Sequence, residues 1–255
     1  MIKKIDSVQN NVIKFIVTLH QKKHIQNNGI CFVEGEKIVI DLIKANKPIK
    51  MILITQDKIN KLSSVINKLN NKLQIVCISE KVAKKISNTV TNAGVFALAE
   101  ITKPAKFNSN ENFIVLDNVQ NPTNVGAIVR TALAYNIKQI FFLNSVYAYL
   151  PQVIRSSMGH ILNVDIFNFT LTEFKNLVKV KKLNLVCAHL NGESLLKFKN
   201  NFINYGIVVG NEGNGVNSDV LKLCNKTITI PMQNNVESFN VAVSFAIIVH
   251  HFSLK

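Results

Sequence analysis

The amino-acid sequence predicts an α/β protein made of two units, residues 1–104 and residues 105–255. Short apolar strands alternate with amphipathic helices along the chain, which is the pattern of sheets covered by helices. The stretch Thr102–Asn112 is polar, lacks periodicity and contains Pro104, so we expect it to link the two units. With 255 residues and 47% apolar side chains, the chain can form a core in each unit.

The first unit alternates helices with short buried strands. Ser7 is placed to cap an amphipathic helix that runs to about Lys23. The further elements that we expect are a strand at Ile30–Val33, a helix at Glu36–Ala45, a strand at Ile49–Ile54, a helix near Asn60–Leu69, a strand at Leu73–Ile78, a short helix from Glu80 and a strand at Gly94–Ala99. This order predicts a compact α/β layer.

The second unit opens with a strand at Phe113–Leu116 and a loop ending near Asn124. That asparagine is placed to cap a helix from Val125 through Tyr135. The later elements that we expect are strands at Ile140–Leu143, Val164–Phe167, Leu183–Ala188, Tyr205–Val209 and Thr227–Ile230, and a last helix from about Phe239 to Phe252. Continuous apolar strands of this kind are typical of a parallel sheet that is covered on both faces.

Charge favours a polyanionic partner. The chain has 30 basic and 15 acidic residues, and residues 1–105 alone hold 17 lysines and 7 acidic residues. Nucleic acid is the commonest partner of such a surplus, although the abundance of Lys, Asn and Ile also fits the bias of an AT-rich genome. Arg130 and Arg155 are the two arginines among the basic residues, and a planar guanidinium suits phosphate or carboxylate.

Several classes of protein are disfavoured by composition. No apolar run approaches the roughly 20 residues that span a bilayer, and the first ten residues lack the apolar core of a signal peptide, so we expect a cytoplasmic protein. The four cysteines, Cys31, Cys77, Cys187 and Cys224, are far apart and form no C-x-x-C pair. We therefore expect neither a zinc site nor a disulfide framework, and no metal.

Three polar loops follow three of the buried strands. They span residues 116–126, 209–215 and 230–240. Ligands of open parallel sheets bind beyond the carboxyl ends of strands, so these loops are the candidate site. Each loop also has a purely structural interpretation: Asn124 would be a helix cap, Arg130 would face solvent, and the glycines of the second loop would form a plain turn. In the third loop, Ser238 or Asn240 would cap the last helix.

Together the loops resemble a known family. The segments LDNVQNPTNVGAIVRTA, VVGNEGNGV and IPMQNNVESFNVAVSFAI resemble, in order and spacing, the three motifs of the SpoU (TrmH-like) RNA 2′-O-methyltransferases of the SPOUT superfamily. The segment FVEGEKIVIDLI, at Phe32–Ile43, is similar to part of the small ribosomal-protein-like substrate-binding domain that many members carry.

The resemblance implies a fold and an activity. The C-terminal domain would contain a trefoil knot and bind S-adenosylmethionine, and the protein would be a homodimer that methylates a ribose 2′-hydroxyl, in ribosomal RNA more than in transfer RNA. A non-catalytic RNA-binding protein with the same fold is the alternative of another class. The intact set of motif residues argues against it, because a binding protein has no need of them.

The resemblance also implies site residues. The catalytic candidates are Asn124, Arg130, Glu212, Ser238 and Asn240. The cofactor would be bound by Val209, Gly210, Asn211, Gly213, Gly215, Ile230, Met232, Ser238 and Asn240. RNA would contact Arg130, Arg155, Lys22 and Lys23. We expect Arg130 to bind the target phosphate and stabilise the developing alkoxide, and Glu212 to fix both its own loop and Arg130.

Overall fold

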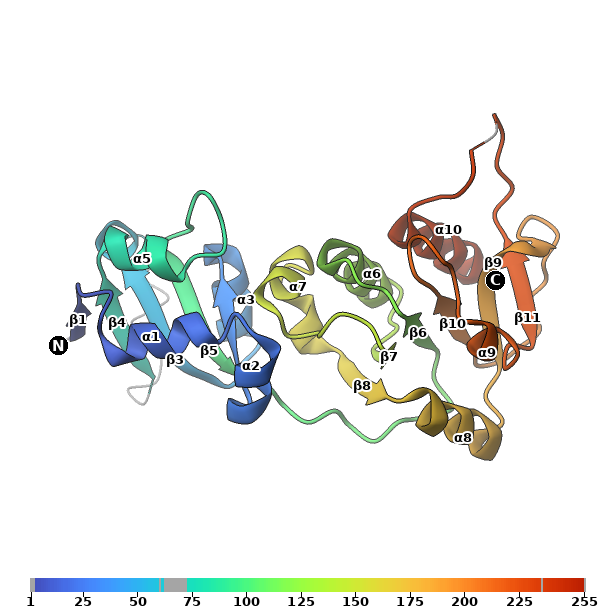
Figure 1. Ribbon diagram of the computed structural model, residues 1–255, viewed down its shortest axis with the longest axis horizontal. Coiled ribbons are helices and arrows are strands. Elements are labelled where there is room, and N and C mark those ends of the chain that lie inside the picture. Colours follow the sequence, from blue (N-terminus) through green and yellow to red (C-terminus); the bar gives the residue numbers. More distant parts are fainter. Residues whose placement is uncertain (1–2, 60, 62–72, 235, 255) are drawn as a thin grey trace. The chain divides into compact units, whose positions relative to one another are not determined.

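The computed structural model describes residues 3–59, 61, 73–234 and 236–254 (Figure 1). The chain forms two compact units. Unit 1 holds the chain up to Thr102 together with Tyr149–Leu162, and unit 2 holds Lys103–Ala148 and the chain from Asn163 onward. The inserted segment of unit 1 carries helix α7 (Pro151–Ser156), which contacts strand β2 (Ile30–Glu34). This grouping could not be predicted from local sequence patterns, because the contacts join segments more than 100 residues apart.

Unit 1 is a sheet with the strand order β1-β4-β3-β5-β2. Its remaining strands are β1 (Lys3–Ile5), β3 (Ile49–Thr55), β4 (Gln74–Ile78) and β5 (Val95–Glu100). Its helices include α1 (Asn11–Thr18), α2 (Lys22–Asn28), α3 (Glu36–Lys44) and α5 (Glu80–Ile86). Strands β1, β4 and β3 are parallel, and β5 is antiparallel to β3 and β2. The predicted alternation is confirmed at β2, α3, β3, β4, α5 and β5, while β1 was not predicted because it is too short for a pattern.

The single helix expected from Ser7 to Lys23 is wrong. Asn10, not Ser7, caps α1, because its Oδ1 accepts the N–H of Val12 at 2.9 Å. The chain turns at Leu19 and begins α2 at Lys22. Both helices bury apolar residues, Ile13 and Ile16 in α1 and Ile25 in α2, so the spacing of apolar residues in the sequence does not show where one helix ends and the next begins. The helix expected near Asn60–Leu69 falls almost entirely on residues outside the described ones.

Unit 2 is a sheet with the strand order β11-β9-β10-β6-β7-β8, and every neighbouring pair is parallel. The strands are β6 (Phe113–Asp117), β7 (Gln139–Leu143), β8 (Asp165–Phe169), β9 (Leu185–Ser194), β10 (Gly206–Val209) and β11 (Lys226–Thr229). The prediction of a parallel sheet is confirmed. The chain adds β7 and β8 on one side of β6 and places β10 on the other. The strand order therefore reverses between β6 and β10, where open α/β sheets bind ligands.

Helices cover both faces of this second sheet (Figure 1). They are α6 (Pro122–Ala134), α8 (Leu171–Lys181), α9 (Ser218–Leu221) and α10 (Val241–Ser253). Phe174 and Val178 of α8 and Val220 of α9 pack in one core with the strand side chains that point to the same face of the sheet. Helix α10 contacts α6 and β10. Apolar side chains of both strand faces are therefore removed from water, which is the main stabilising term of the unit.

The start of α6 differs from the prediction. Asn121 is the cap, since its Oδ1 accepts the N–H of Thr123 at 2.8 Å, and Pro122 occupies the first helical position. Asn124 is thus not the cap. It lies inside the first turn, where only 7% of its surface is exposed, and its amide is directed to other partners.

Candidate functional site

The site is built at the carboxyl ends of β6 and β10. Val209 lies opposite Leu116 in the ladder, so the loops that follow the two strands start side by side. Asn118 turns the first loop with a positive φ of 57°. Its carbonyl oxygen accepts a hydrogen bond of 2.9 Å from Nδ2 of Asn211, which begins the second loop. Two segments about 90 residues apart are joined here.

The second loop is a tight turn closed on itself. Asn211 and Gly215 exchange two backbone hydrogen bonds of 2.9 Å, and Oδ1 of Asn211 accepts the N–H groups of Gly213 and Asn214 at 3.0 Å. A Cβ atom on Gly210 would lie 2.3 Å from the carbonyl carbon of Gly215. Position 210 therefore has room for glycine alone, and the loop keeps a backbone surface that a ligand can approach closely.

Glu212 ties this turn to the start of α6. One carboxylate oxygen accepts Nδ2 of Asn124 at 2.9 Å and the N–H of Asn121 at 3.2 Å, and the other accepts the N–H of Gln120 at 3.5 Å. Partial burial raises the pKa of Glu212, but the hydrogen bonds from Asn124 and from the backbone lower it more, so the pKa lies below its ordinary value. Glu212 is therefore held as a carboxylate at neutral pH.

Asn240 extends the same network to the third loop. Its Nδ2 donates to Oδ1 of Asn124 at 3.0 Å, and its Oδ1 accepts the N–H of Ala242 at 2.9 Å and so caps α10. One of the two alternatives for that cap, Asn240, is confirmed. Residues from three separate motifs thus form one hydrogen-bonded chain, Asn240 to Asn124 to Glu212, in which every side-chain amide has a partner that suits its orientation.

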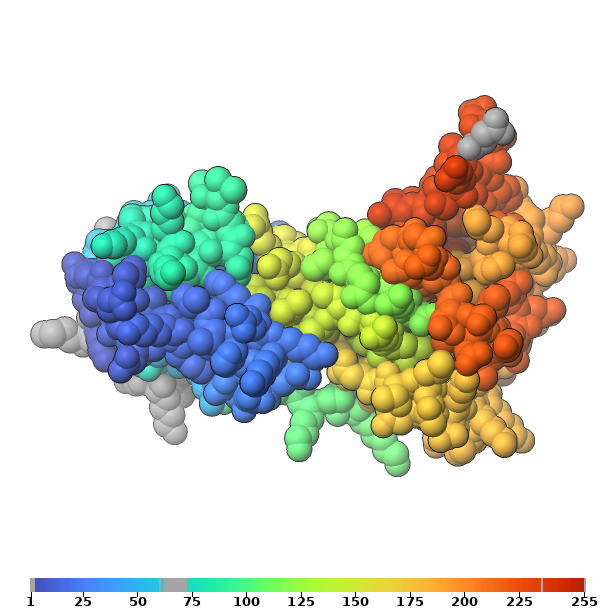
Figure 2. Space-filling view, in the orientation of Figure 1, coloured from blue at the N-terminus to red at the C-terminus, as the bar shows by residue number. Residues whose placement is uncertain are grey.

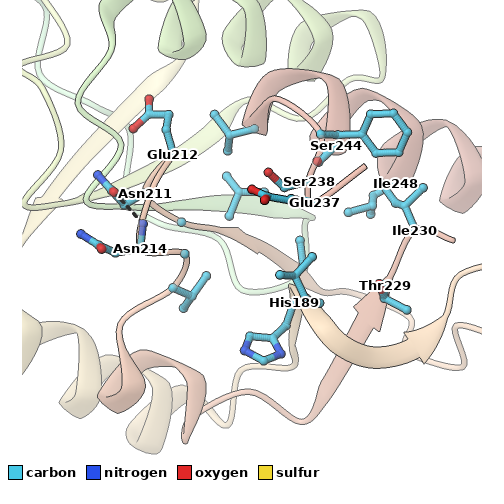
Figure 3. A pocket seen from close by; sticks show the side chains of 18 of the residues that line it. His189, Asn211, Glu212, Asn214, Thr229, Ile230, Glu237, Ser238, Ser244 and Ile248 are labelled. Carbon is cyan, nitrogen blue, oxygen red and sulfur yellow. Dashed lines mark hydrogen bonds between the residues drawn. The ribbon is translucent and has the colours of Figure 1, made fainter. Parts of the chain in front are cut away.

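A pocket of about 370 Å³ opens beside this network (Figure 3). A cavity of this size is in the range that holds one small organic ligand. Nine of the residues predicted for the site line it, namely Val209, Gly210, Asn211, Glu212, Gly213, Gly215, Ile230, Met232 and Ser238. Glycine-rich backbone and polar side chains form one part of the wall, while Ile230 and Ile248 form an apolar part.

Sequence reasoning missed part of the wall. The pocket is also lined by Ala188, His189 and Leu190. In the ladder between β9 and β11, Thr227 pairs with Cys187 and the next residue, Ile228, pairs with Glu193, so residues 188–192 have no partner in β11. Ala188 ends the strand expected at Leu183–Ala188, and His189 and Leu190 follow it directly, which was the available signal. Glu237, which lies beside Ser238 in Figure 3, also lines the pocket and belongs to the predicted third loop.

The remaining predicted residues lie outside the pocket lining. Arg130 is exposed on α6 and has no hydrogen bond or ion pair with any described residue. The expectation that Glu212 holds Arg130 directly is therefore wrong: Glu212 contacts the first turn of the helix that carries Arg130. Arg155 is exposed on α7, and Lys22 and Lys23 are exposed on α2, all in unit 1.

The described part of the chain lacks two further features. It contains no group of three or more His, Cys, Asp and Glu side chains that could hold a metal ion. None of its helices is long and apolar enough to cross a membrane.

A parallel sheet with a ligand pocket beyond its reversed strand order defines an α/β protein that binds a small organic cofactor or substrate. Residues 111–250 match the model of the SpoU rRNA methylase family, and residues 10–97 match the MRM3-like substrate binding domain. The first match spans more than half of the chain and includes all three loops. The protein belongs to the SpoU rRNA methylase family.

Relatives match along nearly the whole chain. A 23S rRNA (guanosine(2553)-2'-O)-methyltransferase of Bacillus subtilis is 24% identical over 98% of this chain and 98% of its own length. The structure of a putative RNA methyltransferase of the TrmH family from Porphyromonas gingivalis superposes with a TM-score of 0.83 at 25% identity, covering 96% and 98% of the two chains. An AdoMet-bound rRNA methyltransferase from Sinorhizobium meliloti, at 22% identity, has the same fold, with a TM-score of 0.83 and coverages of 98% and 97%.

Proposed function

We propose that the protein transfers a methyl group from S-adenosylmethionine to a ribose 2′-hydroxyl of RNA, with ribosomal RNA as the substrate. The observation that carries the proposal is the hydrogen-bonded chain of Glu212, Asn124 and Asn240, which joins the three family motifs beside one pocket. The full-length similarity to a 23S rRNA 2′-O-methyltransferase supports the reaction and the substrate.

The pocket fits S-adenosylmethionine. Backbone groups of Gly210, Gly213 and Met232 would bind its polar ends, and Ile230 and Ile248 offer an apolar wall for the adenine ring. Two carboxylates, those of Glu212 and Glu237, line the same pocket and suit a cationic ligand. When bound, the cofactor supplies a methyl group on a positively charged sulfonium.

The other groups of the chain position the RNA. A guanidinium stays charged at neutral pH, so Arg130 is a poor base; it binds the target phosphate and stabilises the developing alkoxide. Asn124 and Ser238 orient groups around the reacting hydroxyl, and the proton leaves through phosphate or water. Glu212 contributes indirectly, because it fixes the first turn of the helix on which Arg130 stands.

The functional form that we propose is a cytoplasmic homodimer with a trefoil knot in unit 2. Val236, Phe239 and Val243 support the dimer, because these apolar residues are 51%, 39% and 45% exposed before and on α10. The family match over residues 111–250 supports the knot. Free cysteines fit a reducing compartment. Phe239→Glu together with Val243→Glu should give a monomer in light-scattering chromatography; an unchanged mass would reject this interface.

Calorimetry with S-adenosylmethionine tests the proposal, with Arg130→Ala as the matched variant. Both proteins should bind the cofactor, while only the native protein should methylate RNA. Ribosomal and transfer RNA are then compared as substrates, and methylation confined to transfer RNA would reject ribosomal RNA. Absence of cofactor binding by the native protein, with and without RNA, would favour the non-catalytic RNA-binding alternative.

A further inference from the structure

A second hollow lies within unit 1, and four lysines surround it. Helices α1 and α5 are in contact and are exposed on the face of unit 1 shown in Figure 2. Between them is an open depression of about 650 Å³. Its walls carry Lys14 of α1 and Lys81, Lys84 and Lys85 of α5, and Val8 and Val17 contribute apolar surface. We call this feature the lysine groove.

The packing of α5 directs its three lysines to one side. Val82, Ala83 and Ile86 are buried against the sheet, so the residues between them face outward. Lys81, Lys84 and Lys85 are three and four positions apart, which places neighbouring Cβ atoms about 5–6 Å from each other on a helix. The groove thus presents a cluster of ammonium groups and not scattered charges.

The chain itself leaves these charges unneutralised. None of the four lysines forms an ion pair with a described residue, and no acidic side chain lines the groove. The acidic residues nearest to it in sequence are engaged elsewhere, Asp6 with Lys4 at 3.2 Å and Glu80 with Asn92 at 3.5 Å. Four positive charges around one hollow repel each other, and an anionic partner would relieve this repulsion.

Helix stabilisation does not account for the cluster. Lys84 and Lys85 lie in the last turn of α5, where positive charge is favourable. Lys81, however, is the second residue of α5, near a helix N-terminus where positive charge is unfavourable, and Lys14 lies in the middle of α1, where neither helix end favours it. Helix α5 therefore places Lys81 at the groove against its own electrostatic preference.

We propose that the lysine groove binds the phosphate backbone of the RNA substrate. Ammonium groups suit phosphates without reading sequence, and the apolar surface of Val8 and Val17 can receive riboses or unpaired bases. All four lysines of the groove lie in the part of the chain that matches a substrate binding domain, residues 10–97. This inference rests on the proposed function, since it names the surface that holds the substrate of that reaction.

A charge-neutralised variant of the full chain tests the groove. Lys14, Lys81, Lys84 and Lys85 are replaced by Gln in one protein. The matched control replaces Lys37, Lys44, Lys103 and Lys106 by Gln, which removes the same charge from exposed positions outside the groove. Binding to a labelled 30-nucleotide polyuridine and to an in vitro transcript of large-subunit ribosomal RNA is measured from low to high salt, after circular dichroism has verified folding.

The groove variant should bind both RNAs at least tenfold more weakly than the control at 0.15 M salt, and its log Kd against log salt should be shallower by about 3. Equal affinities and slopes for the two variants would overturn the proposal, as would displacement of RNA by polyglutamate at equal charge concentration. Calorimetry with S-adenosylmethionine and methyl transfer by the native protein are measured in parallel. Failure of the native protein in those two assays rejects the proposed reaction and leaves the RNA-binding comparison decisive for the groove.

Discussion

Replacing Asn124 by Asp changes one atom at the centre of the site. Oδ1 can still accept from Asn240, but the donor that reaches Glu212 over 2.9 Å becomes a second carboxylate oxygen. A hydrogen bond to a charged group is worth about 1.5–3 kcal/mol, so its loss alone corresponds to roughly a 10- to 150-fold effect. Because the bond holds the loop that lines the pocket, we expect cofactor affinity to fall by at least about tenfold at pH 8.

The pH dependence makes this prediction specific. Two carboxyl groups in contact share a proton, so one of them titrates well above its ordinary pKa. At pH 5 the protonated carboxyl of the Asn124→Asp protein can donate to its neighbour, and affinity should recover. In the native protein the pKa of Glu212 lies below its usual 4.5, so its stabilising contribution is present above that value and is lost only as the pH falls through the lowered pKa. Native affinity should therefore stay constant between pH 5 and 8.

The assay is calorimetric titration with S-adenosylmethionine at both pH values. Asn124→Ala is the matched control, because it loses the same donor and gains no titratable group. It should bind weakly at pH 5 and at pH 8 alike. Native-like binding by Asn124→Asp at pH 8, or an equal loss at both pH values, would refute the view that this amide holds the loop by donating to Glu212.

Three further predictions concern single residues. Gly210→Ala places a Cβ atom 2.3 Å from the backbone of Gly215, so the turn must move and calorimetry should detect no cofactor binding; binding of native strength would contradict the required close approach. Arg130→Lys keeps the charge but loses the planar fork, so turnover should fall by about 100-fold with cofactor affinity unchanged, and near-normal turnover would remove Arg130 from its role. Burial raises the pKa of Asp117, whose carboxylate accepts the N–H of Asn217 at 2.6 Å. The charged form is then the unfavourable one, so Asp117→Asn should keep or raise the Tm at pH 8 in scanning fluorimetry, and a clear drop would show that the charge is needed.

Local patterns in the sequence were sufficient for the sheet of unit 2 and for its site loops. Continuous apolar strands predict burial on both faces, and the polar runs after them predict which edge of the sheet binds ligands. The family resemblance, and not these patterns, named the individual residues, and nine of them line one pocket. The sequence predicted that Glu212 lies in a site loop, but it did not predict the hydrogen bond to Asn124. That contact depends on how two segments that are distant in the chain meet in the fold.

The missed features share a physical cause: each is decided by non-local contacts. Residues 188–192 are unpaired because of how β9 and β11 meet, so the sequence shows that His189 follows a buried strand but does not place it in the pocket. Likewise, the break between α1 and α2 interrupts no periodicity, and the segment Tyr149–Leu162 joins unit 1 through contacts with residues far away in the chain.

Alkaline hydrolysis of methyl-labelled RNA tests the central claim most directly. Ribosomal RNA transcribed in vitro is incubated with the protein and S-adenosylmethionine labelled in the methyl group, and is then hydrolysed with alkali. A 2′-O-methylated ribose blocks cleavage of the adjacent phosphodiester, so label should appear in alkali-resistant dinucleotides and disappear with Arg130→Ala. Label released as mononucleotides would indicate methylation of a base and contradict the account, as would the absence of label in ribosomal and transfer RNA alike.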